Sequence, residues 1–330
     1  DYQHAAYLTW LEPAGQDRAT GNDATASQFG VYVQEELQHR DFTFRLGARL
    51  NDISYDIDRF GGQPPGSSGQ DWDILLWSGG AKYRISEECA VFANAGSSFM
   101  PPSLKSIGGT VPLDQMFVAG QNGQLPNPNL EPEEGVGTDI GLDWILTKGF
   151  QLSTRAFHTV IEDAIIDNVI SETPSQTMSV NTDGKTTATG FEVGVRHRRE
   201  RCFDWFANVT YTRSEIDDPN DPDQDGAEVP FVPELMGNLG ITFYLPGEIE
   251  VTPWAHFGGN IYDSSSKANR NRFDSDEVIN LSISKSFPLD GDREVVAFAK
   301  GYNLTDNEYE MPWQFRDPGF SMTAGAQLSF

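Results

Sequence analysis

The sequence is poor in the residues that define several common protein classes. Only 2 of its 330 residues are cysteines, which excludes a disulfide-rich scaffold and a four-cysteine metal site. No apolar run approaches the roughly 18 residues that a membrane-spanning helix needs. Basic residues are scarce as well, because 23 Lys and Arg face 49 Asp and Glu, a net charge of −26. This balance excludes a nucleic-acid-binding protein, because binding to phosphates requires an excess of basic side chains.

Aromatic residues make up 12% of the chain, far more than a disordered acidic chain carries. Apolar residues recur with a period of two, which is typical of strands with one apolar and one polar face. Residues 42–50, 203–211, 239–245 and 320–330 show this alternation. We therefore predict an all-β fold with about fourteen strands, near residues 4–11, 28–38, 42–53, 73–85, 89–99, 135–146, 149–162, 186–198, 203–213, 232–245, 248–262, 278–287, 293–303 and 320–330.

The segments between these strands are of two alternating kinds. One set is short, and the other contains the long segments 12–27, 54–72, 100–134, 163–185, 214–230, 263–277 and 304–319. Short turns at one end and long loops at the other are typical of an antiparallel transmembrane β-barrel of an outer membrane. The apolar strand face would then contact lipid and the polar face the lumen. A soluble all-β protein leaves the two kinds of loop unexplained.

The long loops also contain most of the negative charge. They hold 29 acidic and 8 basic residues, a net charge of −21. We expect the mouth of the barrel to be strongly acidic, and therefore to repel an anionic ligand unless arginines or bound cations offset the charge.

Six short strings resemble, in the correct order, the C-terminal part of TonB-dependent outer-membrane receptors. They are residues 29–36 (FGVYVQEE), 99–104 (FMPPSL), 127–133 (NPNLEPE), 189–192 (TGFE), 302–310 (YNLTDNEYE) and the terminal strand that ends at Phe330. The family has a 22-stranded barrel and an N-terminal plug domain. The resemblance implies that residues 1–330 form one barrel domain with about fourteen of 22 strands and no plug domain. No signal peptide is visible before the first strand, and the alternative is a short relative that closes with fourteen strands.

The resemblance implies uptake of a metal chelate, with a ferric siderophore as the expected cargo and cobalamin or another scarce nutrient as the alternative. The implied partners are the TonB complex, contacted through the plug, and the lipid and lipopolysaccharide of the bacterial outer membrane. No resident cofactor is implied. Haem receptors of the family place an axial histidine between the strings at 99–104 and 127–133, and residues 100–134 contain no histidine, so haem is disfavoured. Aromatic and cationic loop residues suit a bulky chelate. The candidate ligand-binding residues are Arg59, Trp72, Phe117, Gln121, Asn122, Arg270, Arg272 and Trp313.

Residues 217–228 contain a partial calcium-loop pattern. Asp221, Asp223, Asp225 and Gly226 match positions 1, 3, 5 and 6 of such a loop, but Val232 stands where the bidentate glutamate belongs. The sequence thus leaves open a weak Ca²⁺ site or a solvated acidic loop.

An enzymatic barrel is the remaining class of function. We place His256 on the lumen side and His158 on the lipid side, neither with an evident acid or nucleophile nearby. We therefore predict no enzyme and no catalytic residue, with a small outer-membrane channel or barrel enzyme as the alternative class. Cys89 and Cys202 lie about four strands apart, too far for a disulfide, and are predicted to be free thiols.

Overall fold

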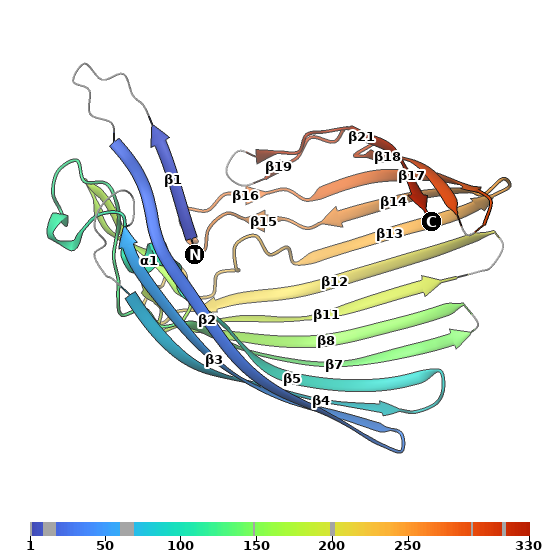
Figure 1. Ribbon diagram of the computed structural model, residues 1–330, viewed down its shortest axis with the longest axis horizontal. Coiled ribbons are helices and arrows are strands. Elements are labelled where there is room, and N and C mark those ends of the chain that lie inside the picture. Colours follow the sequence, from blue (N-terminus) through green and yellow to red (C-terminus); the bar gives the residue numbers. More distant parts are fainter. Residues whose placement is uncertain are drawn as a thin grey trace.

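A computed structural model describes residues 2–8, 18–59, 69–147, 149–198, 202–291, 293–311 and 315–330; side chains are described from Asp23 onward, except those of Arg59 and of residues 310–316. No helix in this part of the chain is long and apolar enough to cross a membrane. Instead, the described residues form one curved antiparallel sheet of 14 strands (Figure 1). In spatial order the strands are β1 (Tyr2–Leu8), β2 (Arg18–His39), β3 (Phe42–Arg59), β4 (Gly69–Arg84), β5 (Cys89–Met100), β7 (Glu133–Thr147), β8 (Phe150–Glu162), β11 (Lys185–His197), β12 (Phe203–Asp217), β13 (Leu235–Leu245), β14 (Ile249–Gly258), β17 (Asp276–Pro288), β18 (Glu294–Tyr302) and β21 (Ser321–Ser329).

Each of these strands coincides with one of the fourteen predicted from the sequence, so the all-β prediction is confirmed. Several boundaries were wrong. β2 begins at Arg18 and β3 continues to Arg59, so parts of the predicted loops 12–27 and 54–72 are strand. The predicted strand 248–262 is interrupted after Gly258. The strands are therefore longer than predicted at the end of the sheet that carries the long loops, so the sheet extends further beside these loops.

The sheet is open in this structure. β1 and β21 form its two edges, so among the described residues the fourteen strands do not close on one another. The alternative of a closed fourteen-stranded barrel is therefore not what the structure shows.

Strand pairing assigns every side chain of the sheet to one of two faces, because directly paired residues share a face. Leu50 and Leu75 are paired on one face and are 61% and 63% exposed. Such exposure of large apolar side chains is expected where the solvent is lipid. In the middle of the sheet, the other face contains charged and amide side chains such as Asn94, Asp139 and Arg155. We call it the lumen face.

Aromatic rings gather on the lipid face at the short-turn end of the sheet. The Trp205 ring packs against Phe150 and His197, with ring centroids 5.9 and 6.1 Å apart. Phe203 continues the group toward Phe243. This arrangement fits an interfacial girdle, in which aromatic side chains occupy the boundary between lipid and water.

Several strand glycines of the lumen face lie beneath a phenylalanine on the neighbouring strand. Gly190 pairs directly with Phe157, and a Cβ added at Gly190 would lie 2.7 Å from that ring. Gly141 is covered in the same way by Phe92. A ring over a glycine restores the packing that the missing side chain removes, while the glycine admits the ring close to the backbone.

The long loops contain regular structure of their own. The elements are α1 (Leu104–Gly108), η1 (Leu113–Gln115), β6 (Gly123–Leu125), β9 (Ile165–Glu172), β10 (Ser175–Asn181), β15 (Ile261–Tyr262), β16 (Arg272–Phe273), β19 (Glu310–Met311) and β20 (Phe315–Arg316). β6, β10 and β9 form a small sheet that joins loop 101–132 to loop 163–184. Figure 1 shows these elements gathered at one end of the main sheet. Both segments had been predicted as plain loops.

A buried apolar cluster attaches this loop structure to the wall. Ile107 of α1 and Leu130 are fully buried against Ile53, Ile57 and Trp72 of the wall. The pairing of Ile53 with Trp72 places both on the lumen face. Loop 101–132 therefore packs on the inner side of the wall, over the entrance to the lumen.

Candidate functional site

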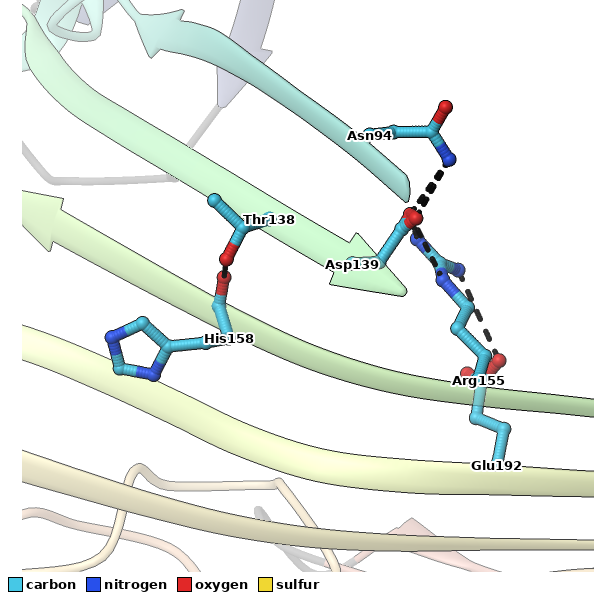
Figure 2. A network of polar contacts seen from close by, with 6 residues as sticks. All are labelled: Asn94, Thr138, Asp139, Arg155, His158 and Glu192. Atoms are coloured by element: carbon cyan, nitrogen blue, oxygen red, sulfur yellow. Dashed lines mark hydrogen bonds and ion pairs between the residues drawn. The ribbon is translucent and has the colours of Figure 1, made fainter. Parts of the chain in front are cut away.

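A charged network crosses the lumen face near the middle of the sheet (Figure 2). Arg155 on β8 donates through Nη2 to Asp139 Oδ1 on β7 at 2.8 Å, and Asn94 on β5 donates to Asp139 Oδ2 at 2.8 Å. Glu192 on β11 lies 3.9 Å from Arg155 Nη1. The Asp139 side chain is 9% exposed, whereas that of Arg155 is 47% exposed. Arg155 and Glu192 therefore offer charged groups to whatever fills the lumen.

Figure 2 also shows how neighbouring residues divide between the two faces. Thr138 precedes Asp139 in the chain and points away from it, where its hydroxyl donates to the backbone oxygen of His158 at 3.3 Å. The His158 ring contacts the Thr189 hydroxyl at 2.7 Å on this lipid face. The predicted lipid-side position of His158 is confirmed.

A second polar group on the lumen face surrounds His256 of β14. Its Nδ1 lies 2.9 Å from Asn238 Oδ1, and its Nε2 lies 3.5 Å from Asp276 Oδ2. The predicted lumen position of His256 is confirmed, but the expectation that it has no acid partner was wrong. Asp276 was missed because it lies on β17, 20 residues along the chain, and only the strand register brings the two side chains together.

The joined loops 101–132 and 163–184 form a compact body, and buried amide side chains hold it together. Gln124 of β6 donates to Asp167 and Ser179, and Asn127 donates to the Ser179 carbonyl at 2.9 Å. Gln176 of β10 is fully buried and binds loop 101–132 through both ends of its amide. We call this unit the loop body.

The ligand-binding candidates on the loop body and the adjoining wall are of two kinds: some are exposed, and others are used within the protein. Phe117 is 60% exposed, and Gln121 is also exposed. Asn122 accepts a hydrogen bond from the Ser175 amide at 2.9 Å and so holds the loop. Trp72 is only 7% exposed within the buried cluster, a packing position rather than a ligand contact in this conformation.

The two arginine candidates of loop 259–275 also differ. Arg270 is held between Glu228, to which its Nη1 donates, and the Tyr262 ring, whose centre lies 3.8 Å from its guanidinium carbon. Arg272 of β16 is exposed. Trp313 and the side chain of Arg59 lie outside the described residues, so their roles stay predictions.

The acidic loop around Asp221, Asp223 and Asp225 is tied down by hydrogen bonds. Asp221 accepts from the Asp223 amide and the Gln224 side chain, and the latter bond is the main cause of the lowered pKa of the Asp221 carboxyl. Asp223 Oδ1 accepts from the Ala268 amide at 2.9 Å. In the part of the chain that the structure describes, no three acidic, histidine or cysteine side chains converge as metal ligands would. Calcium binding at this loop stays a prediction.

The string 302–310 forms a turn that is held by Asn303, whose backbone amide also donates to Asn280 Oδ1 at 3.0 Å. Asn303 is 3% exposed, and its Nδ2 donates to the Asn307 carbonyl and to Asp317 Oδ1, both at 2.9 Å. Tyr309 donates to Asp317 Oδ2 at 2.7 Å. Burial together with this bond to Asp317 raises the pKa of Tyr309 to about 12. The turn returns the chain to β21, so its role is structural.

Cys89 and Cys202 are free thiols, as predicted. Cys89 begins β5, and Cys202 immediately precedes β12. The strands β7, β8 and β11 lie between β5 and β12 in the sheet, which explains why the thiols cannot meet.

Comparison with known proteins places this geometry in a family. Residues 1–304 match the model of the TonB dependent receptor-like β-barrel. The catecholate siderophore receptor Fiu of Escherichia coli K12 is 24% identical over 282 residues, covering 78% of this chain and 35% of the relative. The chain thus spans about a third of the length of the curated relatives it matches.

Solved structures show the same fold. The closed form of Fiu from Escherichia coli K12 superposes with a TM-score of 0.70 at 19% identity, over 96% of this chain and 46% of that one. The copper transporter OprC has a TM-score of 0.73 at 14% identity, over 96% and 49% of the two chains. The chain belongs to the TonB-dependent receptor β-barrel family of bacterial outer-membrane proteins.

Proposed function

We propose that the chain is the barrel portion of a receptor that takes up a ferric siderophore across the outer membrane, with a ferric catecholate as the cargo. The main support is the loop body, which is packed on the lumen face of the wall through Ile107 and Leu130 and so lies over the entrance. The curated relative Fiu, which is named as a catecholate siderophore receptor, supports the choice of cargo.

In this proposal the chain captures and passes its cargo without covalent chemistry. The loops bind the chelate, and the lumen face contacts a plug domain through exposed groups such as Arg155 and Glu192. The plug in turn connects the receptor to the TonB complex, while the lipid face contacts membrane lipid and lipopolysaccharide. His256 is oriented by Asn238 and Asp276, contacts that hold the ring but provide no hydroxyl or thiol nucleophile.

The acidic mouth favours a second cargo within the same mechanism. The segments predicted as long loops have a net charge of −21, and this charge repels an anionic ferric chelate. Arg270 offsets little of this charge, because its guanidinium is already bound by Glu228. A neutral chelate such as cobalamin would meet no such barrier.

Uptake measurements test the proposal. Iron-starved cells that produce the complete protein should accumulate radio-iron from the ferric complex of dihydroxybenzoate, and the uptake should stop when the gene is disrupted or the TonB system is removed. Uptake of labelled cobalamin in place of iron would support the second cargo. Diffusion of unrelated small solutes that is independent of TonB would contradict both and indicate an open channel.

A further inference from the structure

The backbone at Phe117 is strained. Its φ angle is 64°, in the left-handed region that bulky side chains rarely adopt. Among the described residues, the other non-glycine residues in this region of φ are of two kinds. Asp163, Asn303 and Asp306 are types that tolerate it, whereas Arg40, Phe231 and Glu248 are not. A phenylalanine at such a position indicates that the surrounding structure imposes the conformation.

Gln176 imposes that conformation. Its Oε1 accepts the Phe117 amide at 2.8 Å, while its Nε2 donates to the carbonyls of Gln115 and Gln121 at 3.1 and 2.8 Å. Gln176 is fully buried, so its amide is wholly used to shape the turn that displays Phe117. The Phe117 side chain itself is 60% exposed, so the ring gains little from packing within the protein.

The position of the ring points to the cargo. Phe117 belongs to the loop body, because its amide is bound by Gln176, and this body is anchored on the lumen face by Ile107 and Leu130. Leu113 and Val118 of the same segment are each 46% exposed. The acidic mouth repels the anionic centre of a ferric chelate, so capture requires an attraction that does not depend on charge. Stacking against an aromatic chelator provides one.

We propose that Phe117 is a specificity-determining contact for the aromatic rings of the cargo, and that Gln176 positions it. This inference rests on the proposed function. Gln176 holds the backbone at Phe117 in place before the ligand arrives, which lowers the cost of ordering this part of the loop on binding.

The test uses outer membranes that contain the complete protein, with the ferric complex of dihydroxybenzoate as the aromatic probe and ferric citrate as an aliphatic probe. Phe117→Gly removes the ring and relieves the strain. It should weaken binding of the aromatic probe about tenfold or more, a loss typical of a buried aromatic contact. The melting temperature should stay the same or rise, and any binding of ferric citrate should not change. Phe117→Tyr keeps the ring and should retain binding.

Arg40→Gly is the matched control, because Arg40 also has a left-handed φ of 54° but lies in a short turn at the other end of the sheet. It should leave binding unchanged. Gln176→Leu should weaken binding, and adding Phe117→Gly to it should cause little further loss, because both changes act through one ring. If the wild-type protein binds the aromatic probe and the Phe117→Gly variant binds it with the same affinity, the inference is overturned. A wild-type protein that does not bind that probe would instead refute the proposed function.

Discussion

The guanidinium carbon of Arg270 lies 3.8 Å from the centre of the Tyr262 ring, while Nη1 of the same group donates to Glu228. One side chain thus joins loop 259–275 to the acidic loop 218–234. Arg270→Ala should free the acidic loop and speed its cleavage by added protease, with little change in the melting temperature, because the ion pair is partly exposed. Arg272→Ala is the control, and equal cleavage of both variants would contradict the assignment.

The contact should also depend on pH. Partial burial opposes ionisation of Glu228, but the hydrogen bond and charge of Arg270 outweigh it and lower the pKa of the Glu228 carboxyl below 4.5. A lowered pKa means that the stabilisation is present above 4.5 and is lost as the pH falls through the folded-state value. Wild-type loop cleavage should therefore accelerate in acid below this point, whereas cleavage of Arg270→Ala should show no such step.

Alkaline pH should loosen the turn that precedes β21. The pKa of Tyr309 is raised to about 12 from an ordinary value of 10, first by burial and then by Asp317. A raised pKa means that the stabilisation is complete below pH 10 and is lost between about 10 and 12. Amide hydrogen exchange around Asn303 should rise in this window. Tyr309→Phe should lose the step, whereas Tyr302→Phe, a change at an exposed ring of β18, should keep it.

Gly190 and Gly194 provide a matched pair on the lumen face of β11. A Cβ at Gly190 would lie 2.1 Å from the Tyr211 carbonyl oxygen, whereas one at Gly194 would approach nothing closer than Ser153 O at 4.0 Å. Gly190→Ala should lower the free energy of unfolding by about 1–3 kcal/mol, typical of overpacking. Gly194→Ala should be close to neutral. Thermal unfolding in detergent measures both, and equal effects would refute the packing argument.

The lumen network should show non-additive energetics. Arg155→Met leaves the largely buried Asp139 carboxylate with Asn94 as its remaining side-chain donor, and should cost about 1–2 kcal/mol. Adding Asp139→Asn to that variant removes the unpaired charge and should recover part of the loss. A double-mutant cycle of unfolding measures this coupling. Purely additive losses would show that Arg155 and Asp139 act independently.

The strands could be predicted from the sequence because lipid and lumen impose opposite polarity on alternate residues. The rule failed where the lumen face meets the loop body. Ile53 and Trp72 are lumen-facing yet apolar, because Ile107 covers them. The partner that buries them lies far along the chain, so residues 54–72 were predicted as a loop.

The candidate site was harder to predict than the fold, because the residue types that contact a ligand are also those that hold loops together by hydrogen bonds. Arg270 and Asn122 suit a ligand as cationic and amide groups on loops, yet both are bound within the protein. In the sequence, only its aromatic ring marks Phe117 as a candidate. Its strained backbone, and the buried Gln176 that imposes it, depend on a contact 59 residues apart that the sequence does not show.

The long loops are bonded to one another in series. Gln176 binds the Phe117 amide, Thr182 donates to Asp218, and Asp223 accepts from the Ala268 amide. These contacts link four successive long loops. Loops joined in this way move collectively, because displacing one strains the bonds to the next. A displacement of these loops would then be a concerted tilt of all four rather than the folding of a single flap, and a change in any one of these bonds would alter the motion of all four.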